Sequence, residues 1–303
     1  MGTTVDQVIA RVPEWAGRTD LKVSTLGGGI TNENFRIDVG EDSFVLRVSG
    51  ANTDLLGIDR ENEYAATRQA AELGIAPEVV GFLRPEGYLV TRFLKDARPM
   101  PPEAIRRPEN IRRVAETLLH IHAMPPVPGS FSPFRVVETY AGTARRCGVA
   151  APQNFNWFTA RKGEIEAAFL MDPFRPRPCH NDLLNGNFLD DGRLRILDWE
   201  YAGMGDVFFD LANFAVNHDF DDSQDRTLLE AYFGSATPAR LARLKLMKIM
   251  SDFREAMWGV LQIGISKLDF DFREYADKHF QRMTGKLKDP SYATWLQEVV
   301  HGA

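Results

Sequence analysis

Three polar side chains at fixed spacing, and a carboxylate that follows them, are the residues best suited to chemistry. The segment CHNDLLNGNF at 179–188 places His180, Asp182 and Asn187 in the pattern H-x-D-x-x-x-x-N, and Asp198 ends an apolar run shortly afterwards. One carboxylate can receive a proton, while an amide and a second carboxylate can hold a divalent metal. These are the groups that phosphoryl transfer requires of a protein.

The spacing assigns a role to each of these side chains. Asp182 is the candidate base, because a loop carboxylate can orient a substrate hydroxyl and accept its proton. The turn residues D-D-G at 190–192 predict a hairpin that returns Asp198 beside Asn187. Two hard oxygen ligands, completed by phosphates and water, are typical of Mg²⁺. The alternative is a loop of Asn, Asp and Gly that merely turns the chain.

A glycine-rich turn precedes this segment in the chain. The sequence predicts strands at 21–26, 35–39 and 43–48, with GGGITNEN between the first two. Glycines let backbone N–H groups approach a phosphate closely, and neighbouring polar side chains add donors. The candidate phosphate-binding residues of this turn are Gly28, Gly29, Thr31 and Asn32.

Arg47 stands in the apolar strand FVLRV and is a second candidate for binding nucleotide phosphates. A helix predicted over 60–73 carries Glu61 and Glu63 in its first turn. Either carboxylate can hold Arg47 or simply favour the helix dipole. We assign the pairing to Glu63, with Glu61 as the alternative.

A strand at 87–94 leads into a polar, proline-ended run that resembles a hinge. Arg92, Phe93 and Leu94 are therefore candidates for backbone contacts with an adenine. We expect an α+β chain with a β-rich nucleotide-binding lobe at 1–94 and a mostly helical catalytic lobe at 95–303. Helices are predicted over Pro102–Met124, Asn156–Met171, Pro238–Ser266 and Asp271–Met283, and another begins at Asp210.

Composition narrows the class of protein. The 303 residues carry a net charge of −6, which disfavours nucleic acid as a partner. The two cysteines, Cys147 and Cys179, cannot form a disulfide framework or supply a zinc site by their spacing. His120 and His122 diverge on a helix and are interpreted as packing residues. No apolar run reaches the length of a membrane span, so a soluble cytoplasmic protein is expected, with its oligomeric state open.

Several of these segments resemble the choline/ethanolamine kinase family, which belongs with the aminoglycoside phosphotransferases and has a protein-kinase-like two-lobe fold. GGGITNENF resembles the family's glycine-rich loop, FVLRVSG its arginine-bearing strand, and CHNDLLNGN its catalytic loop. ILDWEYAG resembles the metal-binding segment, DLANF the helix that pins the catalytic loop, and MWGVLQIGIS the closing helices. The resemblance implies ATP and Mg²⁺ as cofactors.

The resemblance also implies further site residues. His180 and Asp210 would be structural, the latter by pinning the catalytic loop. Glu200 would lie near phosphates and metal or be structural. Trp258 matches one tryptophan of a box for the substrate ammonium. The chain departs from the family at Leu261, where a second tryptophan is expected, and at Asn217, where an acid is expected; Tyr201, Asp219, Phe220 and Glu255 are the residues that could compensate.

The resulting prediction is ATP-dependent phosphorylation of a small amino alcohol, with choline first and ethanolamine next. A kinase of an aminoglycoside or a sugar is an alternative, since the acidic run at 219–225 could bind a polycation or could start a helix. A nucleotide-binding pseudokinase is less favoured, because Asp182, Asn187 and Asp198 are all present. Only eleven residues separate Asp198 from Asp210, which leaves no room for a protein-kinase activation loop.

Overall fold

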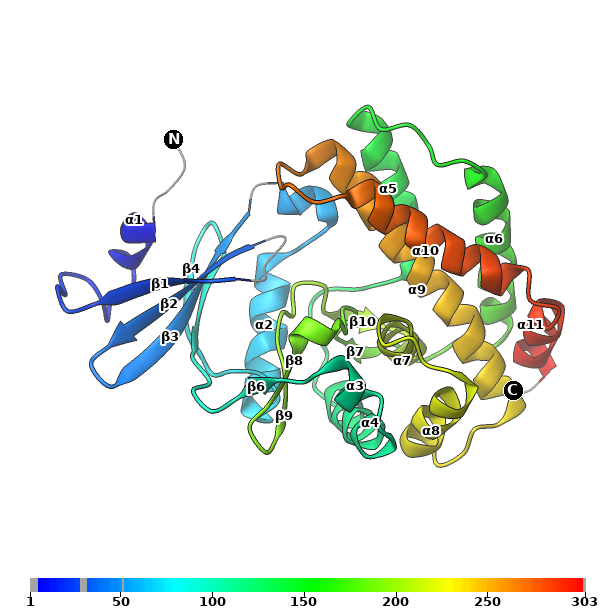
Figure 1. Ribbon diagram of the computed structural model, residues 1–303, viewed down its shortest axis with the longest axis horizontal. Helices are drawn as coiled ribbons and strands as arrows, with labels where there is room; N and C mark the ends of the chain where they lie inside the picture. The colour runs from blue at the N-terminus through cyan, green and yellow to red at the C-terminus, as the bar shows by residue number, and fades with distance from the viewer. Residues whose placement is uncertain (1–4, 28–31, 51, 302–303) are drawn as a thin grey trace. The chain divides into compact units, whose positions relative to one another are not determined.

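The computed structural model describes residues 5–27, 32–50 and 52–301, which form two compact units (Figure 1). The first unit contains the chain up to Pro99 together with Gly186–Glu200. The second contains Met100–Asn185 and the chain from Tyr201 onward. Among the described helices, none has both the length and the apolar composition needed to cross a bilayer.

The first unit is built on an antiparallel five-stranded sheet in the order β1-β2-β3-β5-β4. Ile37, Leu46 and Val90 are fully buried on this sheet and pack with Val8 and Trp15 from the N-terminal segment. Burial of these apolar side chains stabilises the sheet. The elements are α1 (Val5–Ile9), β1 (Lys22–Leu26), β2 (Asn32–Val39), β3 (Asp42–Ser49), η1 (Thr53–Leu56), α2 (Arg60–Glu72), β4 (Val79–Leu83) and β5 (Tyr88–Arg92).

Helix α2 begins where the sequence predicts it. The side chain of Asp59 caps the helix by accepting hydrogen bonds from the backbone N–H groups of Glu61 and Asn62. The cap fixes the first turn of α2, and one turn into the helix stands Glu63. This first turn therefore supplies the acidic residues considered as partners of Arg47.

The predicted hairpin after the catalytic loop is confirmed and belongs to the first unit. Strands β8 (Phe188–Asp190) and β9 (Leu194–Ile196) pair antiparallel, and β6 (Arg98–Pro99) adds to β8. Gly192 closes the turn with a φ of 96°, a conformation in which glycine carries no steric cost. The hairpin places Asn187, the last residue of η2 (Asn185–Asn187), beside Leu197, whose N–H donates to the Asn187 carbonyl.

The second unit is helical and is organised around α9 (Pro238–Ile265), drawn in gold in Figure 1, with α10 (Phe272–Leu287) alongside it. Most of α9 is buried because α5, α7, α10 and α11 all contact it. The other elements are α3 (Pro102–Ile105), α4 (Pro108–His122), α5 (Pro133–Arg146), α6 (Phe155–Met171), β7 (Arg177–Cys179), β10 (Gly203–Gly205), α7 (Val207–Asn217), α8 (Asp222–Phe233) and α11 (Tyr292–His301).

The structure corrects one helix predicted in the second unit and decides between the two interpretations of the acidic run. The run Pro102–Met124 is two helices, because Pro108 has no N–H to continue α3 and instead starts α4 at its first position. The acidic run at 219–225 is a helix start. Asp221 caps α8 in a capping box, and Asp225 accepts from the buried ammonium of Lys248. These two acids are therefore engaged within the fold.

Candidate active site

The catalytic loop follows β7, which pairs with β10, and helix α7 holds its backbone in place. The carboxylate of Asp210 accepts from the N–H of His180 at 2.8 Å and from the N–H of Asn181 at 2.7 Å. The side-chain oxygen of Asn213, one turn later on α7, accepts from the N–H of Leu183 at 2.6 Å. Asn181 has a φ of 65°, which Asn tolerates better than most residues. Backbone contacts on both sides of Asp182 thus fix its position.

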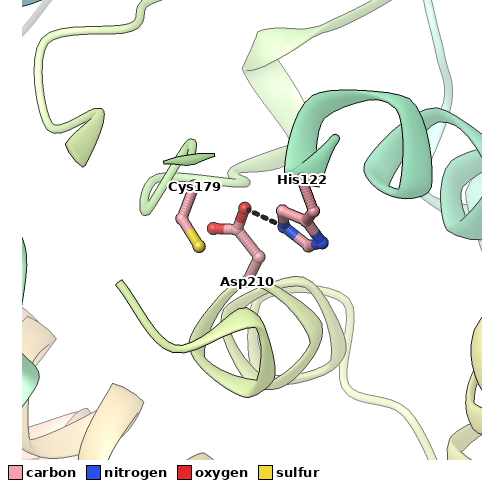
Figure 2. Close-up of side chains that lie close together, drawn as sticks. All are labelled: His122, Cys179 and Asp210. Carbon is pink, nitrogen blue, oxygen red and sulfur yellow. Dashed lines mark hydrogen bonds and ion pairs between the residues drawn. The ribbon is translucent and has the colours of Figure 1, made fainter. Parts of the chain in front are cut away.

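His122 holds Asp210 from the far side, and the sequence-based interpretation of His122 as a packing residue misses these contacts. In the tautomer that satisfies both of its contacts, Nε2–H donates to Asp210 at 3.0 Å (Figure 2). Nδ1 then accepts from the Tyr232 hydroxyl at 2.6 Å. Burial would raise the pKa of Asp210, but the hydrogen bonds from His122 and from the backbone of His180 contribute to a net lowering of that pKa. Asp210 is therefore a carboxylate that holds the loop backbone by hydrogen bonds.

Cys179 lies next to His122 and Asp210, and their three ligand atoms are within 4.8 Å of one another (Figure 2). The group does not have the chemistry of a metal site. Both ring nitrogens of His122 are already engaged in hydrogen bonds, and burial raises the pKa of the Cys179 thiol well above its ordinary value. The Asp210 carboxylate already accepts three hydrogen bonds. The three side chains support the loop structurally.

A buried arginine on α9 contacts the candidate base. Nη1 of Arg254 donates to Asp182 Oδ1 at 3.1 Å and to Glu255 Oε1 at 2.7 Å, and the guanidinium carbon lies 4.3 Å from the ring centre of Tyr201. Burial by itself would lower the pKa of Arg254, but the carboxylates of Glu255 and Asp182 raise it well above its ordinary value. Asp182 is thus paired with a permanent cation.

Aromatic side chains surround this pair. The indole N–H of Trp258 donates to the Tyr201 hydroxyl at 3.2 Å, and the Trp258 ring lies 5.5 Å from that of Tyr275. The Tyr275 hydroxyl donates to Glu255 Oε2 at 2.8 Å. These contacts join six residues into one group, the Asp182 cluster: Asp182, Tyr201, Arg254, Glu255, Trp258 and Tyr275.

Among the substrate-binding residues suggested by sequence, Trp258 and Tyr201 belong to the Asp182 cluster. Glu255, suggested as compensation for the departures at Leu261 and Asn217, belongs to it as well. Leu261 is completely buried one turn beyond Trp258. Asn217 ends α7, and its Nδ2 has no hydrogen-bond partner among the described residues. Asp219 instead pairs with Arg106 and Arg282, and Phe220 packs on Phe214.

In the first unit, Arg47 of β3 forms an ion pair with Glu63 of α2 and a second with Asp198, Nη1 to Oδ1, at 3.2 Å. Burial would lower the pKa of Arg47, but the carboxylates of Glu63, Asp198 and Glu200 raise it above its ordinary value. Glu61 points elsewhere and pairs with the exposed Arg84. The pairing with Arg47 therefore belongs to Glu63, the assignment that the sequence analysis preferred.

Sequence reasoning missed Arg60, which joins the same group. Its guanidinium donates to Glu63 Oε2 at 2.8 Å, to Glu200 Oε2 at 3.1 Å and to Asn32 Oδ1 at 3.1 Å. Asn32 Nδ2 in turn donates to Glu200 at 3.0 Å. Through these contacts Glu200 links the start of β2 to the start of α2. We call this group the Glu63 cluster: Asn32, Arg47, Arg60, Glu63, Asp198 and Glu200.

Of the other residues suggested for nucleotide binding, Arg92 ends β5, and Phe93 and Leu94 follow it directly. Gly28, Gly29 and Thr31 lie outside the described residues. Arg92, Phe93 and Leu94 line a cavity of about 410 Å³. The N–H of Arg92 donates to Glu78 and that of Phe93 to the Ser43 carbonyl, so these two donors are used within the sheet.

Asn187 and Asp198 fit the chemistry of a magnesium site. The β8–β9 hairpin sets them side by side at its open end, since Leu197 bonds to the backbone of Asn187. Both side chains are partly exposed, and both offer hard oxygen donors. Asp198 has a φ of 62°, and such sparsely populated conformations of residues other than glycine cluster at functional sites.

Comparison with known proteins places the chain in a family. The model of the phosphotransferase enzyme family matches residues 22–244. The crystal structure of a choline/ethanolamine kinase family protein from Mesorhizobium loti is 34% identical, has a TM-score of 0.82, and aligns over 96% of each chain. The chain belongs to the choline/ethanolamine kinase family.

Two curated members of this group are more distant. Protein LicA of Haemophilus influenzae is 28% identical over 213 residues, which cover 68% of this chain and 61% of LicA. Ethanolamine kinase 2 of Rattus norvegicus is 26% identical over 308 residues, which cover 89% of this chain and 77% of that protein. Family membership confirms the predicted enzyme class, a small-molecule phosphotransferase, and the predicted α+β kinase-like fold.

Proposed function

We propose that the chain is an ATP-dependent kinase that phosphorylates the hydroxyl of a small amino alcohol, with choline and ethanolamine as the candidate acceptors. The observation that carries the proposal is the Asp182 cluster. It places the candidate base among a second carboxylate and three aromatic side chains. Proton acceptance and recognition of an ammonium group are thereby combined in one buried group of residues.

The charges of the cluster suit a monocation. Asp182 and Glu255 are carboxylates and Arg254 is a guanidinium, so the three together carry one net negative charge. Trp258 and Tyr275 add aromatic rings whose faces attract cations, most strongly where water is excluded. Leu261, which stands where the family carries a second tryptophan, is completely buried and adds no aromatic face.

Each residue then has a defined task in the reaction. Asp182 orients the acceptor hydroxyl and takes its proton as the hydroxyl oxygen attacks the γ-phosphorus of ATP, whose bond to the β,γ-bridging oxygen breaks to release ADP. Asn187 and Asp198 would hold Mg²⁺, which when bound offsets the negative charge of the phosphates. Arg47, kept in place by Glu63, brings a further positive charge to the phosphates. Asp210 keeps the catalytic loop in the required conformation.

The proposal is tested by ADP release from the wild type and from Asp182→Asn, with choline, ethanolamine, aminoglycosides and simple sugars as acceptors. Loss of a general base should lower kcat by about 10²- to 10⁴-fold and leave the binding of Mg-ATP largely unchanged. Asp277→Asn, an exposed substitution on α10, serves as the matched control and should behave as wild type. No turnover of either amino alcohol would reject the acceptor class, and turnover of Asp182→Asn within about tenfold of wild type would reject the base.

A further inference from the structure

Arg254 is a charged residue in the middle of a buried helix, where such residues are expensive. It is 2% exposed and lies within a run of α9 in which every residue from Leu246 to Gln262 is buried. Its Nη1 bridges Asp182 and Glu255, while Nε and Nη2 have no hydrogen-bond partner among the described residues. Burial of the guanidinium therefore costs stability, and the hydrogen bonds that offset this cost all come from one nitrogen, Nη1.

The contacts of Arg254 are directed at the side chain of Asp182, whereas the loop's own contacts are directed at its backbone. Asp210 and Asn213 bind N–H groups of the residues on either side of Asp182. Contacts with the backbone do not by themselves set the two side-chain torsions of Asp182. A hydrogen bond from Arg254 to Oδ1 restricts that rotation and so sets the direction in which the second oxygen meets a hydroxyl.

Glu255 holds Arg254 in turn. Its Oε1 accepts from Arg254, and its Oε2 accepts from the Tyr275 hydroxyl of α10 at 2.8 Å. The face of the Tyr201 ring, 4.3 Å from the guanidinium carbon, supports Arg254 from another direction. Glu255 and the Tyr201 ring thus hold the guanidinium of Arg254 independently of Asp182. A side chain that positions another one must itself be held in this way.

We propose that Arg254 is a positioning residue for Asp182, which sets the orientation of the base carboxylate and balances its charge. The inference rests on the proposed function, because it requires Asp182 to act as the base. A misplacement of about 1 Å at a reacting group can cost about 100-fold in rate. Removing Arg254 should therefore lower kcat without weakening the binding of Mg-ATP.

The same helix supplies a matched control. Arg243 is also a buried arginine of α9, 5% exposed, and it also bridges two carboxylates, those of Asp206 and Asp172. Its guanidinium carbon lies 4.5 Å from the ring centre of Phe169. Arg243 and Arg254 thus share helix, burial, ion pairing and ring contact, but only Arg254 touches the base.

The experiment compares Arg254→Met and Arg254→Lys with Arg243→Met and Arg243→Lys in the full chain, with kcat normalised to the folded fraction measured by circular dichroism. We expect Arg254→Met to lose about 100-fold in kcat with the KM for Mg-ATP unchanged, and Arg254→Lys to recover part of the loss. The Arg243 variants should lose stability to a similar degree but keep kcat within about threefold of wild type.

A double variant separates positioning from general damage. If Arg254 acts through Asp182, adding Arg254→Met to Asp182→Asn should leave the residual rate unchanged within about threefold, because the group that it positions is gone. A further loss of about 100-fold in the double variant would overturn the inference, as would normal kcat in folded Arg254→Lys and Arg254→Met. If Asp182→Asn itself is active, the proposed function fails rather than the inference. Should Arg254→Met not fold, the Lys variant and its double variant with Asp182→Asn decide the question alone.

Discussion

Replacing Glu63 by Gln removes the negative charge at the centre of the Glu63 cluster. The Glu63 side chain is 2% exposed and contacts two cations, Arg47 and Arg60, through its two carboxylate oxygens. The substitution keeps the size of the side chain and leaves both guanidinium groups buried. It therefore tests the charge and not the packing.

The expected cost follows from what remains around the two arginines. Removing one partner of a buried ion pair costs about 3–5 kcal/mol, because an uncompensated charge is left behind. Asp198 and Glu200 remain at 3.2 and 3.1 Å from the two guanidinium groups and keep part of the compensation. We therefore expect about 3 kcal/mol for Glu63→Gln, at the low end of that range. Glu61→Gln, on the same turn of α2, breaks an exposed pair and should have no measurable effect.

Because the chain has two compact units, one global unfolding curve does not isolate this change. Hydrogen exchange of peptides from α2 and β3 reports local opening directly. Protection in Glu63→Gln should fall by a factor of about 100 or more, which corresponds to about 3 kcal/mol, and the KM for Mg-ATP should rise because Arg47 is no longer held. Equal protection in Glu63→Gln and Glu61→Gln would show that the charge of Glu63 contributes nothing, and would refute the reasoning.

Two further predictions concern pH and metal. Burial lowers the pKa of His218 from 6.5 to about 4, so the folded chain keeps this imidazole neutral while the unfolded chain protonates it below pH 6.5. The free energy of unfolding should therefore fall as the pH drops from 6.5 towards 4, by about 3 kcal/mol in total. In denaturant titrations at each pH, His218→Gln should make this dependence on pH flatter. An unchanged dependence in His218→Gln would contradict the prediction. Asp198→Asn should raise the Mg²⁺ concentration needed for half-maximal activity by about tenfold or more, with the KM for the acceptor unchanged. An unchanged Mg²⁺ requirement would show that Asp198 is not a metal ligand.

Local spacing was enough to predict the parts of the site that lie close together in the chain. The catalytic loop and the hairpin that returns Asp198 to Asn187 depend on a turn of a few residues. Glu63 was predictable as the partner of Arg47 because a capped helix presents only two acids in its first turn. In each case the neighbours in space are set by one short loop or one helix start.

Two contacts that sequence reasoning missed join elements that are distant in the chain. Arg254 is separated from Asp182 by 72 positions, and His122 from Asp210 by 88. No local rule predicts such contacts. A signal was nevertheless present, because the charged pair at 254–255 stands between the apolar residues Phe253 and Ala256 in a long helix. Charges of that kind are rarely buried without a partner, so the pair itself indicates that an opposing polar group must meet it.

In the proposed reaction, helix α9 combines the two demands that an amino-alcohol acceptor makes. Arg254 contacts the base, Glu255 contacts Tyr275 and Arg254, and Trp258, one turn later, contacts Tyr201. The groups that orient the base and those that would receive the ammonium therefore share one rigid helix. Their separation is fixed by its rise of about 1.5 Å per residue and not by the conformation of a loop. In the proposed reaction, a substrate is therefore selected by the distance between its hydroxyl and its ammonium as much as by the chemistry of either group.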